Sequence, residues 1–104
     1  MNGFVKVCSL SALADETALH VDVGRTPVCV VRSQGEVVAL LDECSHAEVA
    51  LSDGDVEAGT IECWLHGSRF DLRTGKPTGL PATEAVPIYP VRIDGDDVLV
   101  AVKE

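Results

Sequence analysis

Two short segments decide how this chain is interpreted: Cys44-Ser45-His46 and Cys63-Trp64-Leu65-His66. Each segment brings one cysteine and one histidine close together, and sixteen residues (47 to 62) lie between them. Two thiolates and two imidazoles are a donor set that can hold a metal centre. Because each segment supplies one ligand of each kind, the pattern favours a [2Fe–2S] cluster with both cysteines on one iron and both histidines on the other.

Zinc is the alternative metal for these side chains, since two cysteines and two histidines also make a structural zinc site. Such zinc sites more often combine a Cys-x₂₋₄-Cys pair with a separate pair of histidines, and this chain lacks that spacing. We therefore favour the cluster and regard zinc mainly as a substitute metal during expression.

The remainder of the chain is typical of a small all-β protein. Hydrophobic residues make up 46% of the 104 residues and aromatic residues only 4%, and β-branched and aliphatic runs of this kind favour strands. The expected strands are residues 4–8, 18–23, 28–31, 37–41, 60–64, 69–72, 91–93 and 98–102. Two hairpins are predicted, around Ser33-Gln34-Gly35-Glu36 and around Asp94-Gly95-Asp96-Asp97. We expect a turn or one helical turn at 12–16, a break at 24–27, and no helix of ten or more residues, which indicates an antiparallel sandwich or barrel-like fold.

The pattern Cys44-x-His46, sixteen residues, Cys63-x-x-His66 resembles the signature of the Rieske iron–sulfur proteins. The similarity continues through His66-Gly67-Ser68-Arg69-Phe70-Asp71, through the turn Thr74-Gly75, and through Gly79-Leu80-Pro81-Ala82, which resembles the proline loop that covers the cluster in that family. The resemblance covers nearly the whole chain and is strongest over 37–102. The subgroup that the chain resembles most is the small soluble ferredoxins that serve bacterial non-haem iron dioxygenases.

The resemblance implies a Rieske-like antiparallel β-sandwich with a small cluster-binding subdomain formed by two ligand loops and the proline loop. Residues 1–104 would form a single domain, with the cluster-binding part at about 42–82. One [2Fe–2S] cluster is implied, with Ser68, Trp64 and Pro81 around it. Trp64 could lie over the cluster and limit solvent access, or it could belong to the core.

The resemblance also bears on the reduction potential. Rieske proteins of respiratory complexes add two cysteines that bridge the ligand loops, and Val49 and Leu65 occupy the matching positions here. Those proteins also place a serine and a tyrosine near the cluster, where Ser68 and Phe70 stand in this chain. Hydrogen bonds to cluster sulfur favour the reduced state. The resemblance therefore implies a potential in the lower part of the Rieske range, with Ser68 keeping it above the bottom.

The function implied is that of a one-electron carrier between a ferredoxin reductase and a terminal non-haem iron oxygenase, and not that of an enzyme. A catalytic oxygenase needs a second iron held by two histidines and a carboxylate, but the 38 residues after His66 contain no histidine. The alternative is an accessory subunit of another redox system, similar to the small subunit of nitrite reductase or associated with cluster assembly. Members of the nitrite-reductase type often lack ligands, whereas this chain has all four.

Charge and hydropathy limit the kinds of partner that this chain is expected to bind. A formal net charge of −9 argues against nucleic acid, because nucleic-acid binders carry basic patches. Seven acidic residues and no Lys or Arg lie within 42–63; they could form a solvated surface or a docking face for a basic partner. The amino terminus lacks the features of a signal peptide and no segment has the apolar length of a membrane span. We expect a cytoplasmic monomer that does not bind membranes.

Five further residues have chemistry outside the ligand pattern. Cys8 and Cys29 lie in apolar runs and are expected to be buried small hydrophobic residues. His20 is expected to be an ordinary surface or half-buried residue. Arg69 and Arg73 could contact a partner or pair with acidic residues of the surface.

Overall fold

The computed structural model describes residues 3–43, 49–57, 59–64, 67–78 and 84–102. These residues form ten β-strands and two short 3₁₀ turns, and the strands make three antiparallel sheets. The predicted all-β class and antiparallel fold are therefore confirmed. Within the described part of the chain, no helix has the length and apolar character needed to cross a bilayer.

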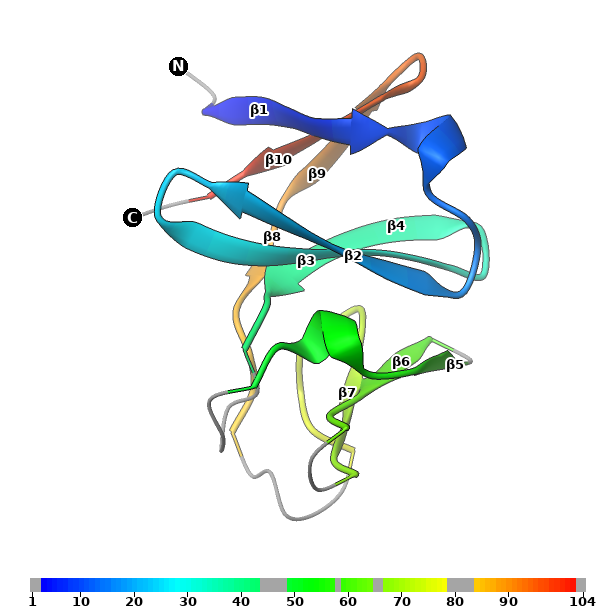
Figure 1. The fold of residues 1–104 in the computed structure, drawn as a ribbon, viewed down its shortest axis with the longest axis vertical. Coiled ribbons are helices and arrows are strands. Elements are labelled where there is room, and N and C mark those ends of the chain that lie inside the picture. Colours follow the sequence, from blue (N-terminus) through cyan, green and yellow to red (C-terminus); the bar gives the residue numbers. More distant parts are fainter. Residues whose placement is uncertain (1–2, 44–48, 58, 65–66, 79–83, 103–104) are drawn as a thin grey trace.

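The three sheets lie one above another when the molecule is viewed as in Figure 1. The first sheet has the order β1-β10-β9 and consists of β1 (Phe4–Ser9), β10 (Asp97–Ala101) and β9 (Val91–Asp94). The middle sheet has the order β2-β3-β4-β8 and consists of β2 (Thr17–Val23), β3 (Thr26–Ser33), β4 (Glu36–Leu41) and β8 (Ile88–Tyr89). The third sheet has the order β5-β6-β7 and consists of β5 (Val56–Glu57), β6 (Thr60–Glu62) and β7 (Arg69–Asp71).

Strand β3 is buried on both of its faces, which explains its unbroken apolar sequence. Val28, Cys29, Val30 and Val31 are all fully buried. Because side chains alternate across a strand, Val28 and Val30 enter one hydrophobic cluster, with residues of β10, while Cys29 and Val31 enter another, with residues of the third sheet. The middle sheet thus separates two cores, and the second core supports the third sheet.

Local turn chemistry sets the two predicted hairpins. In the β3–β4 turn, Gln34 and Gly35 both have positive φ, 55° and 79°, the two-residue geometry that matches the twist of antiparallel strands. Ser33 pairs with Glu36 across this turn. The β9–β10 hairpin closes through Gly95, with φ of 63°, and Asp97 pairs with Asp94. Both hairpins were predicted correctly from these residues.

Three details of the expected strand pattern were wrong. Residues 24–27 were expected to interrupt the chain, but Thr26 and Pro27 belong to β3, where the proline is near the strand start and accepts a hydrogen bond from Asp42 N (3.0 Å) through its carbonyl. The strand expected at 60–64 ends at Glu62. The two-residue strands β5 and β8 were not predicted, since two residues carry too short a pattern. A turn or one helical turn was expected at 12–16; the 3₁₀ turn η1 lies earlier, at Leu10–Ala12, and a turn follows at residues 15–16.

The third sheet is entered through a second 3₁₀ turn, η2 (Leu51–Asp53), followed by Gly54. A Cβ atom at Gly54 would lie 1.7 Å from the carbonyl oxygen of Glu62. Only glycine therefore allows the chain after η2 to pass this closely over the end of β6.

We predict that Gly54→Ala destabilises the protein by about 3 kcal/mol, because the added methyl group must displace the backbone of Glu62. Gly35→Ala is the matched control, since a Cβ there meets nothing within 4 Å and the cost is the positive φ alone, about 1 kcal/mol. The midpoints of thermal unfolding at one scan rate compare the two variants. An equal loss in both would contradict the close approach at Gly54.

Candidate metal centre

Of the four proposed ligands, Cys63 lies within the described residues, whereas Cys44, His46 and His66 lie outside them, as does Pro81. The described residues contain no cluster of three potential metal ligands. The site is therefore defined here by the described segments that lead into and out of the ligand loops.

Cys63 follows directly after β6 and is fully buried within the core under the third sheet. Its backbone N–H donates to the carbonyl oxygen of Ser68 (2.6 Å), and its carbonyl accepts from the N–H of Gly67 (2.9 Å). Gly67 has φ of 77°, which glycine adopts without strain. Two backbone hydrogen bonds thus join Cys63 to Gly67 and Ser68, the described residues on either side of the position of His66 in the sequence.

The first ligand segment is closed in a different way, by the side chain of Asp42. This carboxylate is buried, with its side chain 0% exposed. Oδ1 accepts from the backbone N–H of Ser52 (2.7 Å) and Oδ2 accepts from the Ser52 hydroxyl (2.6 Å). Because Cys44 and His46 lie between Asp42 and Ser52 in the sequence, these bonds fasten the two ends of their loop together.

The two ligand segments meet where η2 passes over the end of β6. Glu62 N donates to Asp55 O (2.8 Å), beside the glycine contact described above. Leu51, at the end of the first segment, and Cys63, at the start of the second, belong to the same hydrophobic cluster. Residues distant in sequence are therefore held at one end of the molecule, opposite the β1-β10-β9 sheet (Figure 1).

The segment that carries Pro81 is fastened at both of its ends to β7 and the following turn. Before it, Thr78 N donates to Arg69 O (2.7 Å). After it, Val86 N donates to Gly75 O (2.9 Å), and a Cβ at Gly75 would lie 2.2 Å from Val86 O. The second ligand segment and the segment of Pro81 thus both begin and end at the third sheet or the turn after β7, while the first ligand segment runs from the end of β4 to η2.

Two residues compared earlier with respiratory Rieske proteins, Ser68 and Phe70, are both fully buried. Phe70 belongs to the core cluster under the third sheet, and Val49 packs against that cluster. Leu65 lies outside the described residues. None of the cysteines in the described residues (Cys8, Cys29 and Cys63) forms a disulfide.

Trp64 is not a core residue, because 53% of its surface is exposed. The alternative of a plain core role is therefore wrong. An exposed indole next to Cys63 places a large apolar surface beside the ligand turn.

The charged residues include ion pairs and an exposed acidic surface, and Glu57 belongs to both. Arg69 donates to Thr60 Oγ1 (3.1 Å) and to Glu57 Oε1 (3.4 Å), while Arg73 pairs with Glu36 (3.0 Å). Both arginines thus pair within the chain, one of the two expected alternatives. Asp53, Asp55 and Glu57 are exposed, as is Glu43, whereas Asp42 is not part of this surface.

Of the two cysteines outside the pattern, Cys29 is fully buried, as predicted, and burial raises the pKa of its thiol well above the usual range. Cys8 was also expected to be buried, but it is only partly buried, near the edge of its cluster. Burial, assisted by the charge of Asp96, raises the pKa of the Cys8 thiol. Both side chains are therefore protonated thiols near neutral pH.

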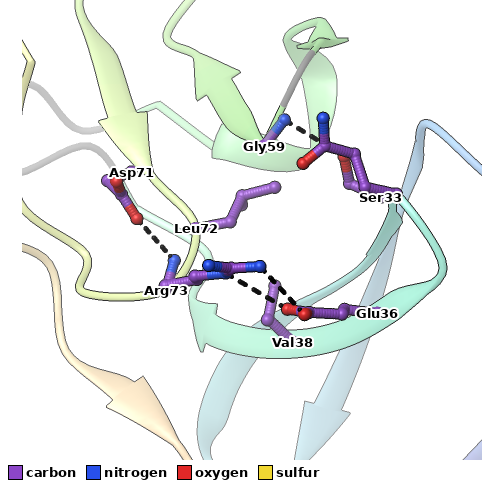
Figure 2. Close-up of a pocket in the computed structure, with 8 residues that line it drawn as sticks. Ser33, Glu36, Val38, Gly59, Asp71, Leu72 and Arg73 are labelled. Atoms are coloured by element: carbon purple, nitrogen blue, oxygen red, sulfur yellow. Dashed lines mark hydrogen bonds and ion pairs between the residues drawn. The ribbon is translucent and has the colours of Figure 1, made fainter.

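A pocket of about 210 Å³ lies between the β3–β4 hairpin and the turn after β7 (Figure 2). Its polar groups bond to one another: Arg73 N donates to Asp71 Oδ1 (2.7 Å), and Gly59 N donates to Ser33 Oγ (3.2 Å). The Gly59–Ser33 bond and the Arg73–Glu36 pair join segments of the third sheet to the β3–β4 hairpin of the middle sheet. The pocket is therefore best interpreted as a junction between sheets.

His20 was expected to be an ordinary residue, and sequence reasoning missed its contacts. Its side chain is 45% exposed on β2, as expected, but Nδ1 lies 2.5 Å from Asp42 Oδ2 and Nε2 lies 3.1 Å from Asp22 Oδ1. The hydrogen bond to Asp42, reinforced by the charges of both carboxylates, raises the pKa of His20. The alternation of His20 and Asp22 on one strand face was the available signal, but the contact with Asp42 depends on tertiary structure.

Comparison with known proteins agrees with this architecture. Residues 3–90 match the Rieske [2Fe–2S] domain family. The chain is 43% identical over 95 residues to the ferredoxin component of biphenyl 2,3-dioxygenase from Rhodococcus jostii (strain RHA1), covering 91% of this chain and 89% of the relative.

Solved structures give the same result. The ferredoxin of carbazole 1,9a-dioxygenase from Nocardioides aromaticivorans IC177 aligns with a TM-score of 0.92 and 43% identity, covering 96% of this chain and 98% of that chain. A chain from the complex of reduced oxygenase and oxidized ferredoxin in carbazole 1,9a-dioxygenase aligns with a TM-score of 0.91 and 32% identity, covering 97% of this chain and 94% of that chain.

Three small antiparallel sheets, with a buried cysteine in a closed turn at one end, define a β-type iron–sulfur domain. The chain belongs to the Rieske [2Fe–2S] family, and its cofactor is a [2Fe–2S] cluster. It is a ferredoxin, an electron-transfer component of the kind found in dioxygenase systems, and not a catalytic component.

We predict that His20 titrates above its ordinary pKa of 6.5, because Asp42 and Asp22 both favour the protonated ring. A raised folded-state pKa means that the stabilisation from His20 is fully present below the unfolded pKa and is lost as pH rises through the folded pKa. The test is an NMR titration of the His20 ring protons from about pH 5 to about pH 9.

Asp22→Asn serves as the control for this titration. It removes the weaker of the two carboxylates, so the midpoint should fall but remain above that of an unstructured histidine. A midpoint at or below 6.5 in the unmodified protein would show that these contacts do not form in solution.

Proposed function

We propose that Cys44 and Cys63 bind one iron of the cluster as thiolates and that His46 and His66 bind the other as neutral imidazoles. The observation that carries this assignment is the fully buried Cys63, which directly follows β6 and whose backbone N–H and C=O bond to Ser68 and Gly67 on the other side of His66 in the sequence. A donor set of two soft sulfurs and two nitrogens suits the mixed ligation of a Rieske centre. Within the single domain 1–104, residues 42–82 would form the cluster-binding part.

When bound, the cluster would supply one-electron redox chemistry at a potential above that of an all-cysteine centre. The residues of this chain hold it and limit the access of water to it. Ser68, which is buried and accepts a backbone hydrogen bond from Cys63, would influence the potential, and Pro81 would belong to the loop that covers the cluster. Trp64, exposed beside Cys63, would extend the surface through which the histidine side of the centre meets a partner.

The partners we propose are a ferredoxin reductase, which supplies single electrons, and a terminal non-haem iron oxygenase, which accepts them. The solved complex of an oxygenase with its ferredoxin in carbazole 1,9a-dioxygenase supports this proposal, because the match to that complex covers nearly all of this chain. We propose that this exchange takes place in the cytoplasm and that the carrier is a monomer.

The acidic surface of Asp53, Asp55 and Glu57 lies on the chain that joins the two ligand segments. Opposite charge on a partner would speed the encounter, and the effect would weaken with salt. We propose that this surface is a docking face for a basic partner. The alternative is that it only keeps the protein well solvated.

A turnover assay distinguishes an electron carrier from the alternative, an accessory subunit of another redox system. A carrier passes electrons from a reductase to cytochrome c at a rate that depends on its concentration, whereas a subunit without a redox role does not. The high identity to dioxygenase ferredoxins over most of the chain favours the carrier.

We predict that Cys63→Ala abolishes cluster binding and that Cys29→Ala does not. Both cysteines are fully buried in the same hydrophobic cluster, so both substitutions remove similar packing and only one removes a ligand. The measurements are iron per chain and the EPR spectrum of the reduced protein. A spectrum without a signal, together with one zinc per chain in the unmodified protein, would contradict the cluster assignment.

We predict that Ser68→Ala lowers the reduction potential, because a hydrogen bond from the serine to a cluster sulfur would favour the reduced state. One such bond of ~1 kcal/mol corresponds to a shift of roughly 40 mV for a single electron. Ser33→Ala is the control, since Ser33 is also buried but lies in the junction with the middle sheet. Equal potentials in both variants would show that the Ser68 hydroxyl bonds elsewhere.

A further inference from the structure

The carboxylate of Asp42 is unusual among the acidic residues described, because it is buried and accepts hydrogen bonds from two distant parts of the chain. Its partners are the N–H and hydroxyl of Ser52 and the ring of His20 on β2. Its own backbone N–H donates to Pro27 O on β3 (3.0 Å). A buried carboxylate is costly unless such bonds compensate for its lost hydration, so this residue is held firmly in one position.

The position of Asp42 relates it directly to the proposed ligands. It lies two residues before Cys44, and Ser52 lies six residues after His46. The segment between them emerges from β4 and returns to the core at Leu51, which is fully buried. Nothing else among the described contacts joins the two ends of this segment by side-chain hydrogen bonds to one group.

We propose that Asp42 is a positioning residue for the cluster, one that fixes the loop carrying Cys44 and His46 by joining its ends through Ser52 and by anchoring them to β2 through His20. This inference rests on the proposed ligand set, since it assigns Asp42 a role toward those two ligands. The second ligand loop needs no such side chain, because its ends are joined by backbone bonds between Cys63, Gly67 and Ser68.

The chemistry of the carboxylate suits this role better than that of a neutral side chain. Both of its oxygens accept, so it can satisfy the N–H and O–H of Ser52 and a ring N–H of His20 at once. Hydrogen bonds to a charged acceptor are shorter and stronger than those between neutral groups. Removing one partner therefore loosens the loop while the β-sheets, which do not depend on these bonds, remain.

The test compares Ser52→Ala with Ser11→Ala in the cluster-loaded protein. Ser11 is a matched control because it makes the same pair of bonds, N–H and hydroxyl, to the two oxygens of Asp96 (both 2.9 Å), far from the ligand loops in sequence. The readouts are the rate at which an iron chelator removes the cluster and the EPR line shape of the reduced protein, with the thermal midpoint of each variant for reference.

We expect Ser52→Ala to release its cluster roughly fivefold faster, the equivalent of one lost hydrogen bond, and to change the EPR line shape. Ser11→Ala should do neither. Ser52→Thr, which keeps the hydroxyl, should restore the slow rate. His20→Gln, a substitution on the exposed face of β2, should also accelerate release and provides the test if Ser52→Ala yields no folded protein.

Two outcomes overturn different statements. If the unmodified protein carries no [2Fe–2S] signal, the proposed ligand set fails. If the signal is present but Ser52→Ala and His20→Gln release the cluster at the same rate as Ser11→Ala, with unchanged line shapes, Asp42 has no positioning role and its bonds serve only the fold.

Discussion

The burial of β3 on both faces is the constraint on which the rest of the structure depends. Four consecutive side chains, Val28 to Val31, alternate between the two cores and are fully buried in both. A strand covered on one side only would leave the third sheet without a hydrophobic base, because that sheet has only short strands of its own. The cluster-binding end is therefore stable as an extension of the middle sheet and would not be expected to fold alone.

On this base, contacts of the described residues that flank the ligand segments join the two ends of each segment. Each loop is closed at its ends: one by the Asp42 carboxylate, one by the turn at Cys63, and the segment of Pro81 by β7 and Gly75. An electron carrier benefits from such closure, because a centre that changes shape little on reduction needs little reorganisation of its surroundings. The contacts that position the site are mainly backbone hydrogen bonds and glycine approaches, which are insensitive to most side-chain changes.

Sequence reasoning succeeded where the signal was local. The hairpins follow from turn residues, and the family follows from the Cys-His spacing, which needs no tertiary information. It failed where a contact depends on register between distant elements. The bond between His20 and Asp42 joins β2 to the residue that follows β4, and β8 is defined by the pairing of Ile88 and Tyr89 with Leu40 and Ala39 of β4. Pro27 was misjudged because a proline at a strand start is permitted when its missing N–H is not needed there.

The structure also arranges the charged residues differently from what the sequence suggests. Asp42 belongs to the acidic stretch of the sequence, but it is buried and bonds to Ser52 and His20. Arg69 forms an ion pair with Glu57, and Arg73 forms one with Glu36. Asp53 and Asp55 are exposed, and neither is paired with an arginine in the described ion pairs. The unpaired negative charge of the 42–63 stretch therefore comes from fewer residues than the sequence alone indicates, and Trp64, next to Cys63 in the sequence, is also exposed. Charge that attracts over a distance and an apolar side chain that packs on contact are the two features that a transient electron-transfer encounter requires.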